Sequence, residues 1–495
     1  MAMFPLPKTL PKLDDCIPKH RGLYYDGEWH EPIDGQYVET FNPGNGTVIT
    51  KVAFAGAADT EAALKAAQKA FPAWRAMPPV QRGKLLKRAA QVFRDNAVEL
   101  ALLDAANIGS PITIMASDAH FAAEYLDYYA GLIPAVTGET NDLGEKTFNY
   151  TVREPLGVVA RIVASNHPMM FTGTKMGPAL AMGNTLVIKT PEQAPLSALR
   201  LMELLAGIFP PGVFNLVSGG VECGKVLSTH PIVRKITLIG SLPTGRAIQK
   251  AAADSLKLSV LELGGKNALI AYPDADIDRL VDGITAGMNW SWCGQSCGST
   301  SRVFLHADIY DKVIGLAKTK LEQAYRPGNP LDPATTMGSL VSKAAQDRVL
   351  RYIEIGKKEG ARLVMGGEPP QSEDCRGGYF ILPTIFADVE SSMTIAQEEI
   401  FGPVLSIIKW TDEETLYQQV NSVEYGLSGA VFTSNMSTAQ RAIRRIEAAT
   451  VWVNTAATHF LGMPWGGYKQ SGIGREDCFE EMVEMTQRKA VHVLL

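Results

Sequence analysis

Short apolar runs alternate with helical runs through the middle of this chain, and this alternation restricts its possible folds more than any other feature. The β-rich runs are GVVARIVA (157–164), TLVIKT (185–190), FNLVS (214–218), KITLIGS (235–241) and SVLELGG (259–265). Helical stretches such as 196–209 and 244–255 lie between them. Because neighbouring parallel strands need a crossover connection, the alternation predicts a doubly wound parallel sheet.

A second alternating set follows, and it predicts a second α/β domain. Its β-rich members are SRVFLH (301–306), PVLSIIKW (403–410), GAVFT (429–433) and TVWVN (450–454), with a helix over about 309–324. A chain of 495 residues is long enough for about two to four domains. The predicted class is therefore α/β with more than one sheet.

The first part of the chain is mostly helical. Residues 57–108 carry apolar side chains at helical spacing, with Thr60 as the expected N-cap, and another helix covers 118–130. The turn-rich stretch after that helix ends in the alternating run FNYTV (148–152). This pattern predicts a protruding strand segment rather than a linker.

Charge and composition favour a small-molecule ligand over nucleic acid or a membrane. The formal net charge is −5 and the basic residues are scattered, so no broad positive field would attract a phosphate backbone. No apolar run approaches the roughly 20 residues that span a bilayer, and the apolar start is too short for a signal peptide. We therefore expect a cytoplasmic protein.

Two of the six cysteines lie four residues apart in CGQSCGSTSR (293–302). The six are too sparse for a disulfide framework, and no second pair of ligands nearby in the sequence would complete a zinc site. We therefore expect reduced thiols and no metal. Inert packing and a nucleophilic role both remain open for Cys293 and Cys297, and an oxidant could also join the two thiols.

Glu262 is a carboxylate within the apolar run SVLELGG. Burial would raise its pKa toward neutrality, which suits a general base, although an ion pair with an Arg or Lys is the alternative. Asn166 follows another predicted strand. It is either a turn residue or an amide that donates to a developing oxyanion.

Other polar residues also follow predicted strands, where open parallel sheets bind ligands. Gly240, Ser241 and Gly245 open a predicted helix that could receive a phosphate. A plain strand-to-helix turn is equally open, because the spacing is GxxxxG rather than GxGxxG. Lys189 and Glu192 could hold the hydroxyls of one ribose, or they could be solvated loop charges.

Taken in order, these motifs resemble the aldehyde dehydrogenase superfamily of non-acylating, NAD(P)-dependent enzymes, from about residue 20 to the end of the chain. The motifs that carry the resemblance are Asn166, PALAMGN (178–184), KTPE (189–192), Gly240-Ser241 with Gly245, ELGGK (262–266), GQSC (294–297), EIFGP (399–403) and PWGG (464–467). Their common order is more specific than any one motif.

The resemblance implies an oxidation of an aldehyde to a carboxylic acid through a cysteine thiohemiacetal and a thioester. Cys297 would be the nucleophile, Asn166 the oxyanion donor and Glu262 the base that activates water. Lys175 and Glu476 match residues linked to proton relay behind that base. Hydrolysis is implied because relatives that pass the acyl group to coenzyme A lack the glutamate.

The resemblance also implies a cofactor site, with NAD preferred over NADP. Lys189 and Glu192 would bind the adenosine ribose. Gly240 and Ser241 would approach the pyrophosphate, at the GxxxxG turn that ends at Gly245. Glu399 and Phe401 would hold the nicotinamide half. Cys293 matches no position with a role in the family.

The chain departs from the family pattern around the substrate. Ser165 and His167 replace common aromatic residues on either side of the asparagine, and Trp292 replaces an asparagine ahead of Gly-Gln. The expected pocket is Ser165, His167, Met170, Trp292, Phe460 and Trp465, with Met169, Phe171, Trp290 and His459 as further candidates. This lining predicts a bulky, aromatic or otherwise planar aldehyde.

Two alternative functions remain. The same tryptophans could hold an amino or betaine aldehyde through cation–π contacts. An inactive structural relative would show damage at Asn166, Glu262 or Cys297, and none is visible.

The resemblance finally implies three domains. They are a doubly wound cofactor-binding domain (1–127 and 150–261), an α/β catalytic domain (262–470) and a small β oligomerisation arm (128–149 and 471–495). The end of the chain, QRKAVHVLL, is typical of an edge strand that extends a neighbour's sheet. We therefore expect a homodimer or homotetramer.

Overall fold

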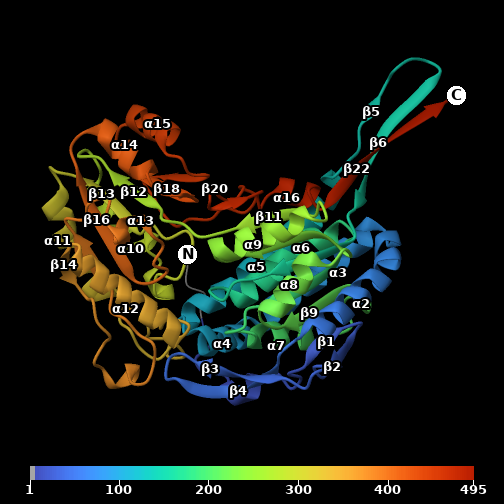
Figure 1. Ribbon diagram of the computed structural model, residues 1–495, viewed down its shortest axis with the longest axis horizontal. Coiled ribbons are helices and arrows are strands. Elements are labelled where there is room, and N and C mark those ends of the chain that lie inside the picture. The colour runs from blue at the N-terminus through green and yellow to red at the C-terminus, as the bar shows by residue number, and fades with distance from the viewer. Residues whose placement is uncertain (1–5) are drawn as a thin grey trace.

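The computed structural model describes residues 6–495, and each half of the molecule contains one large sheet (Figure 1). The first sheet has the strand order β2 (Glu28–His30), β1 (Leu23–Tyr25), β9 (Phe214–Ser218), β8 (Thr185–Thr190), β7 (Val158–Ile162), β10 (Val233–Ile239), β11 (Leu258–Glu262) and β21 (Gly472–Ile473). The strands from β9 to β11 are parallel, whereas β1, β2 and β21 pair antiparallel.

Helices cover both faces of this sheet. One face carries α2 (Ala57–Ala76), α8 (Val221–Thr229) and α9 (Leu242–Ala253), and the other carries α3 (Pro79–Asp95), α4 (Ala97–Ile108), α5 (Ile112–Leu132), α6 (Pro168–Ala181) and α7 (Leu196–Leu204), with α1 (Leu13–Cys16) against α4. Successive residues of β8 enter opposite cores. Leu186 and Ile188 pack with Phe93, whereas Val187 packs with Leu64, as the period-2 alternation of a strand requires.

The second sheet has the order β14 (Arg362–Met365), β15 (Thr384–Ala387), β16 (Val404–Trp410), β13 (Arg302–His306), β12 (Ala268–Ala271), β18 (Ser428–Phe432) and β19 (Thr450–Val453). Its two faces are covered by α10 (Ile277–Gly287) with α11 (Tyr310–Ala324), and by α12 (Lys343–Lys358), α13 (Thr394–Gln397), α14 (Glu413–Asn421) and α15 (Met436–Arg445). Leu269 faces the first group and Ile270 the second.

The predicted α/β class with a doubly wound sheet is confirmed, and the predicted runs 185–190 and 214–218 coincide with β8 and β9. The prediction that Thr60 caps a helix is wrong. The helix begins at Ala57 after Gly56, and the Thr60 hydroxyl donates to the Gly56 carbonyl at 2.8 Å inside the first turn. Asp59 accepts the Gly56 N–H at 3.0 Å and so completes the cap.

A three-stranded sheet projects from the first half of the molecule (Figure 1). It consists of β22 (Thr486–Leu494), β6 (Thr147–Pro155) and β5 (Thr140–Asn141) in that order. β6 continues to Pro155, beyond the arm limit of 149 expected from the sequence, because it pairs with β22 along its whole length. Residues 471–485 lie on the body instead, with β21 paired to β11 and α16 (Phe479–Val483) against α6.

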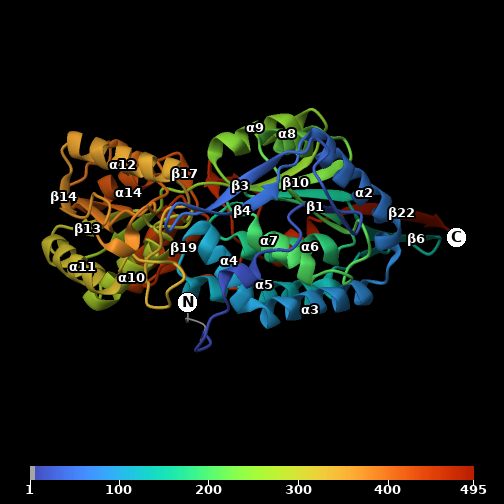
Figure 2. The same cartoon turned by 90° about the horizontal axis from the view of Figure 1, so that it is seen from below.

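The chain crosses between the two halves at several places, and one crossing follows β11 directly. Segment 263–267 joins β11 of the first sheet to β12 of the second, and the two halves lie side by side in both views (Figure 2). Ser471 stabilises this segment through two hydrogen bonds. Its carbonyl accepts from the Leu263 N–H at 2.9 Å, and its hydroxyl donates to the Gly264 carbonyl at 2.7 Å.

A hairpin of β3 (Tyr37–Asn42) and β4 (Thr47–Ala53) forms a further contact between the halves. In its turn the Pro43 carbonyl accepts the Tyr379 N–H at 2.9 Å. Where the chain returns from β19 of the second sheet to β21 of the first, β17 (Tyr425–Gly426) pairs with β20 (Tyr468–Lys469). Within residues 6–495, no helix has the length and apolar character that a membrane crossing requires.

Candidate active site

The loop that carries Cys297 is shaped by left-handed backbone. Asn289 and Cys293 both have a φ of 55°, and Gly294 has a φ of 68°. A Cβ at Gly294 would collide with the Gly402 carbonyl, so only glycine allows this close approach. The cysteine loop therefore packs directly on the segment EIFGP (399–403).

Two amide side chains fix the GQSC segment in place. The Asn267 amide donates to the carbonyls of Cys297 at 2.7 Å and Ser299 at 2.9 Å. The Gln295 carbonyl oxygen accepts the Val341 N–H at 3.0 Å. Since Asn267 ends the crossing segment, the loop is anchored to the same stretch of chain that carries Glu262.

The Cys297 thiol and the Glu262 carboxyl face each other. The distance from Sγ to Oε2 is 3.5 Å, and Glu262 is 3% exposed. Burial, with the charge of Glu476 behind it, raises the pKa of Glu262 to about 8. Burial and the neighbouring Glu262 and Glu399 also raise the pKa of Cys297 well above its ordinary value. The pair thus places a thiol beside a carboxyl that titrates near neutral pH, an arrangement that suits a nucleophile and a general base.

Asn166 lies one residue ahead of the N-cap of α6 and is buried. Its Oδ1 atom accepts no hydrogen bond from any group in residues 6–495. An asparagine that shapes a turn uses this oxygen as the acceptor, so the turn interpretation has no contact to support it. The side chain remains available to a ligand.

Behind Glu262 lies a cluster of buried charges that includes the predicted relay pair. The Lys175 ammonium is 2.8 Å from Glu476 and 2.9 Å from Asp477. Although burial alone would lower the pKa of Lys175, Asp477 and Glu476 raise it well above its ordinary value. Lys175 therefore stays charged and pairs with both carboxylates.

Arg161 completes this cluster from β7. Its guanidinium contacts Glu476 at 3.2 Å and Glu481 at 2.8 Å, and Glu481 also accepts from the Tyr129 hydroxyl at 2.7 Å. Burial opposes the charge of Glu481, but Lys175 and Arg161 outweigh it and lower the pKa of Glu481 to about 2. Glu481 thus stays ionised and paired, whereas burial raises the pKa of its neighbours Glu476 and Asp477.

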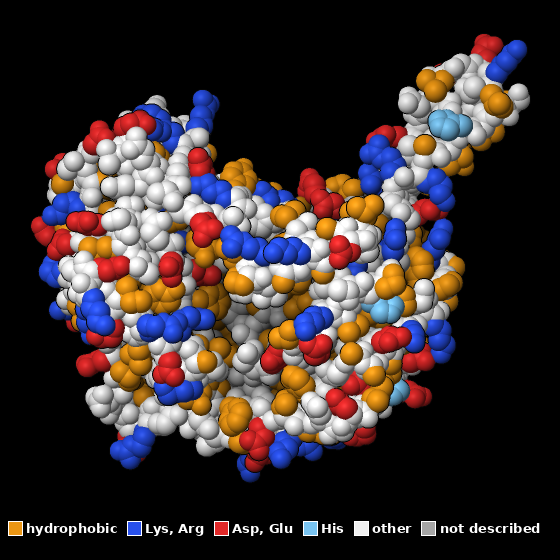
Figure 3. Space-filling view, viewed as in Figure 1, with side chains coloured by type: hydrophobic (Ala, Val, Ile, Leu, Met, Phe, Trp, Pro, Cys, Tyr) orange, Lys and Arg blue, Asp and Glu red, His pale blue; other side chains and the backbone are white. Residues whose placement is uncertain are grey.

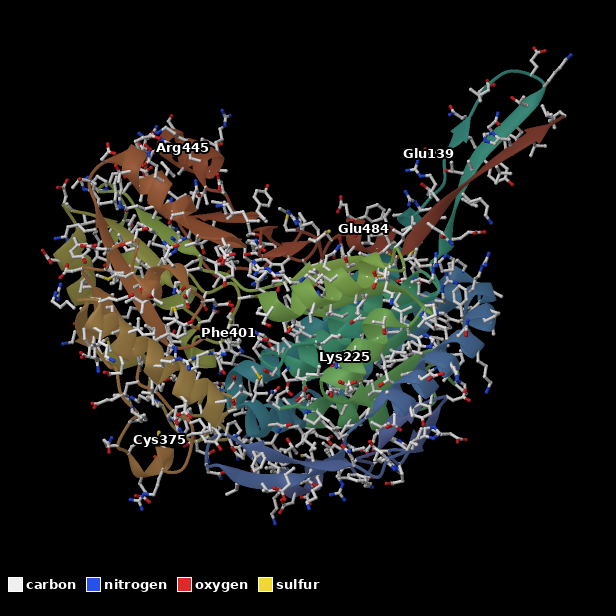
Figure 4. All side chains as sticks on the ribbon, viewed as in Figure 1. Glu139, Lys225, Cys375, Phe401, Arg445 and Glu484 are labelled. Atoms are coloured by element: carbon white, nitrogen blue, oxygen red, sulfur yellow. The ribbon has the colours of Figure 1, made fainter. Side chains whose placement is uncertain are left out.

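Glu399 and Phe401 lie beside the cysteine loop, at the boundary between the halves. The Glu399 carboxylate accepts the Gly265 N–H at 2.9 Å, while burial raises its pKa to about 7. Figure 4 shows Phe401 between the two halves, where the surface of the molecule is hollowed (Figure 3). Phe401 has a φ of 52°, an uncommon backbone geometry for a bulky residue.

The other predicted cofactor residues lie at the carboxyl ends of the first sheet's strands. Lys189 is nearly buried at the end of β8, where burial lowers its pKa, and the exposed Glu192 lies beside Gly220. A buried lysine with an exposed carboxylate next to it suits a ligand with several hydroxyls, so these residues fit the ribose of a dinucleotide.

The start of α9 has the form of a phosphate site. Ser241 is the N-cap residue, but its hydroxyl contacts the Thr244 hydroxyl at 3.0 Å rather than capping the backbone. The first-turn N–H groups are therefore available to an anion. Gly245 is buried, and a Cβ there would collide with Leu263. This glycine therefore serves the close packing of helix on strand.

Several rings surround the cysteine loop. The ring centroids of His167 and Trp292 are 5.2 Å apart, and those of His459 and Trp465 are 4.5 Å apart. Trp465 also contacts Gly298, next to Cys297. Of the other predicted pocket residues, Ser165 and Met170 are half-buried, and Phe460 is 63% exposed.

Two residues considered at the pocket, Met169 and Trp290, are core residues instead, and so is Cys293. Met169 and Trp290 are 0% exposed and pack in the interiors of the first and second halves. Cys293 is likewise 0% exposed, and burial raises the pKa of its thiol. Inert packing accounts for Cys293, and its burial argues against oxidative pairing with Cys297.

Sequence reasoning missed the residues that support the site. Asn267 directly follows ELGGK but has no signal of its own in the sequence. Arg161 does have one, because it is a charge inside the apolar run GVVARIVA. The rule that singled out Glu262 would have found Arg161 as its counterpart. Asp118, fully buried in α5, contacts His167 at 2.8 Å and had no visible sequence signal.

The chain is similar to known proteins along nearly its whole length. The model of the aldehyde dehydrogenase family matches residues 29–491. Aldehyde dehydrogenase tropH of Talaromyces stipitatus is 52% identical over 493 residues, which cover 98% of this chain and 96% of the relative. A betaine aldehyde dehydrogenase of Rhizobium etli is 42% identical over 475 residues, 95% of this chain and 96% of the relative.

A solved structure extends the agreement to three dimensions. The NAD⁺ complex of an aldehyde dehydrogenase from Bacillus cereus superposes with a TM-score of 0.94 at 37% identity, covering 99% of both chains. The chain belongs to the aldehyde dehydrogenase family.

Proposed function

We propose that this enzyme oxidises a bulky, planar aldehyde to the carboxylic acid with NAD. The observation that carries the proposal is the 3.5 Å contact between the Cys297 thiol and the Glu262 carboxyl. The buried carboxyl lies next to the sulfur that would carry a thioester, where it can take a proton from an attacking water.

The Cys297 thiolate attacks the aldehyde carbon, and the Asn166 amide with a backbone N–H stabilises the oxyanion of the thiohemiacetal. NAD, when bound, accepts a hydride from the substrate carbon. The acyl group is then a thioester on Cys297. Glu262 takes a proton from water, and the resulting hydroxide releases the acid. Lys175 and Glu476 lie behind Glu262 and relay its proton.

The cofactor assignment rests on the residues around the hollow between the halves. Lys189 and Glu192 would bind the adenosine ribose, the start of α9 at Gly240 and Ser241 the pyrophosphate, and Glu399 and Phe401 the nicotinamide half. The NAD⁺ complex of the Bacillus cereus relative supports the choice of cofactor. The exposed Glu192 carboxylate would repel the 2′-phosphate of NADP.

The substrate assignment rests on the rings and on the small Ser165 beside Asn166. Ser165 and His167 leave space next to Asn166 that a larger ring would fill, and Trp292 and Trp465 offer flat apolar surfaces to a planar substrate. Initial rates on aliphatic, aromatic and amino aldehydes with NAD and NADP test the proposal. A clear preference for acetaldehyde would contradict it, as would the lack of any effect of Ser165→Trp on the size preference.

The second candidate function is oxidation of betaine aldehyde. The Rhizobium etli relative carries that name, and Trp292 and Trp465 could hold a quaternary ammonium group through cation–π contacts. The two candidates differ in the charge of the substrate. Rates on betaine aldehyde and benzaldehyde at matched concentrations separate them.

The projecting arm suggests a homodimer or homotetramer. β22 is an edge strand of the arm sheet, and the arm exposes large apolar side chains, among them Phe148 and Leu494 at 50% and 86% (Figure 3). An exposed edge strand is a template for pairing with another chain. Light scattering after removal of residues 486–495 should give a smaller particle than the full chain. An unchanged mass would contradict the assignment.

A cytoplasmic location is proposed on the state of the cysteines. All six are unpaired, and five of them are buried. Reduced thiols are typical of the cytosol. Cell fractionation with a marker for each compartment tests the location, and recovery of the enzyme in a membrane or secreted fraction would contradict it.

A further inference from the structure

A histidine and an aspartate form a pair at the mouth of the substrate site. The Nδ1 atom of His167 lies 2.8 Å from Oδ2 of Asp118. Asp118 comes from α5 and its side chain is 0% exposed, whereas the His167 side chain is 15% exposed. The two residues are 49 positions apart in the sequence, so the fold, and not local sequence, brings them together.

Asp118 fixes the state of the imidazole. A carboxylate can only accept at Oδ2, so Nδ1 of His167 carries the proton and donates it. The second oxygen of Asp118 has no hydrogen-bond partner in residues 6–495. The carboxylate is therefore committed to the histidine.

The imidazole ring is held on the wall of the site. Its centroid is 5.2 Å from that of Trp292 and 5.5 Å from that of Phe171, which packs edge-on. His167 directly follows Asn166 in the chain. No group among the described residues hydrogen-bonds to Nε2 of His167, so the ring has one committed nitrogen and one available nitrogen.

Further rings lie beside the cysteine loop. The His459 ring packs against Trp465, and Trp465 contacts Gly298 next to Cys297.

We propose that Nε2 of His167, oriented by Asp118, hydrogen-bonds an oxygen substituent on the substrate, so that the preferred substrate is an aromatic aldehyde with a ring hydroxyl. The inference rests on the proposed function. In its neutral form the ring accepts from a phenolic O–H, and as the cation it donates to a phenolate. Either way, Nε2 recognises the same oxygen. A substrate ring without an oxygen substituent would leave Nε2 of His167 without a hydrogen-bond partner among aromatic side chains, and this would weaken binding.

The test compares kcat/KM for benzaldehyde, for 3- and 4-hydroxybenzaldehyde and for the matching methoxybenzaldehydes. At least one hydroxybenzaldehyde should be preferred over benzaldehyde by about tenfold, the ratio expected for one hydrogen bond of ordinary strength. The methoxy compound at the same position cannot donate a hydrogen bond to Nε2 and should lose this advantage.

Variants then connect the preference to the pair. His167→Phe retains a ring against Trp292 but has no nitrogen, so the ratio of hydroxybenzaldehyde to benzaldehyde should fall to about one. His167→Gln retains a polar group and should keep part of the preference. Asp118→Asn can no longer fix the Nδ1 proton and should reduce the ratio severalfold. Phe171→Leu is the matched control, because it alters the same wall without removing a polar group and should change both rates alike.

Two failures can be told apart. If benzaldehyde and the hydroxybenzaldehydes are all poor substrates beside acetaldehyde, the proposed function is wrong. If aromatic aldehydes are oxidised well but without a preference for the hydroxyl, or if His167→Phe and His167→Gln both fold and leave the ratio unchanged, the role of His167 is wrong. Melting curves identify variants that do not fold, and Asp118→Asn then provides the independent test.

Discussion

Sγ of Cys297 lies 3.5 Å from Oε2 of Glu262, although the two side chains come from different halves of the molecule. Glu262 ends β11 of the first sheet, and Cys297 precedes β13 of the second. Segment 263–267 joins the halves, and its last residue, Asn267, binds the Cys297 carbonyl. The same five residues thus help to set the distance between the Glu262 carboxyl and the Cys297 thiol.

Cys297→Ala should abolish aldehyde oxidation, whereas Cys293→Ala should retain most of it. Only Cys297 contacts Glu262, while Cys293 packs in the core. Loss of the buried sulfur of Cys293 should lower the free energy of unfolding by about 1–2 kcal/mol. Steady-state rates and urea unfolding of both variants provide the measurement, and similar losses of activity in the two would refute the assignment.

The rate of deacylation should increase as the pH rises through about 8, and Glu262→Gln should remove this dependence. Glu262 accepts a proton only when ionised, and burial with Glu476 raises its pKa to about 8 from 4.5. Because the folded pKa is raised, ionisation costs stability as the pH rises through it. The melting temperature of Glu262→Gln should therefore exceed that of the wild type more at pH 9 than at pH 6. If the difference in melting temperature between Glu262→Gln and the wild type becomes smaller as the pH rises, Glu262 is not a buried carboxylate without a counter-charge.

NAD should be preferred over NADP, and Glu192→Gln should narrow the preference. The exposed carboxylate accepts from ribose hydroxyls and repels a 2′-phosphate. Ratios of kcat/KM for the two cofactors are the measurement. Glu222→Gln is a suitable control, since Glu222 is also exposed on this half and pairs only with Lys225. A higher kcat/KM with NADP in the wild type would overturn the assignment.

Arg161→Leu should lower the free energy of unfolding by about 3–5 kcal/mol, because it leaves Glu476 and Glu481 buried with only part of their counter-charge. Arg362→Leu is the matched control. Its pair with Asp388 is about half exposed on both sides, and such a pair contributes about 1 kcal/mol or less. Denaturant unfolding of both variants is the measurement. Equal decreases in the free energy of unfolding would mean that breaking the buried cluster destabilises the protein no more than breaking an exposed ion pair.

The sequence could predict the fold class because its strands carry their own signal. β8 and β9 are continuous apolar runs bounded by polar or turn residues, and their limits were found from the pattern alone. β12, with only the four residues Ala268–Ala271, is too short for a periodic signal and was missed. Its burial comes from neighbouring strands that are distant in the sequence.

The sequence marks a candidate site residue where that residue breaks a local rule. Glu262 stands out in the sequence as a charge in an apolar strand. Cys293 and Cys297 look alike in their local sequence, and the structure separates them because Cys293 is buried and Cys297 is partly exposed. The pairing of His167 with Asp118 could not be predicted, because nothing in α5 marks one aspartate as the partner of a residue 49 positions away.

The most direct test of the proposed roles of Cys297 and Glu262 is mass spectrometry of Glu262→Gln after one turnover with NAD and an aromatic aldehyde. We expect a burst of NADH of about one equivalent and an acyl adduct on the peptide that contains Cys297, because the amide cannot take a proton from water. The wild type under the same conditions should carry little adduct. If the first turnover of Glu262→Gln is slowed as much as later ones and no adduct accumulates, then Glu262 does not act as the base for thioester hydrolysis.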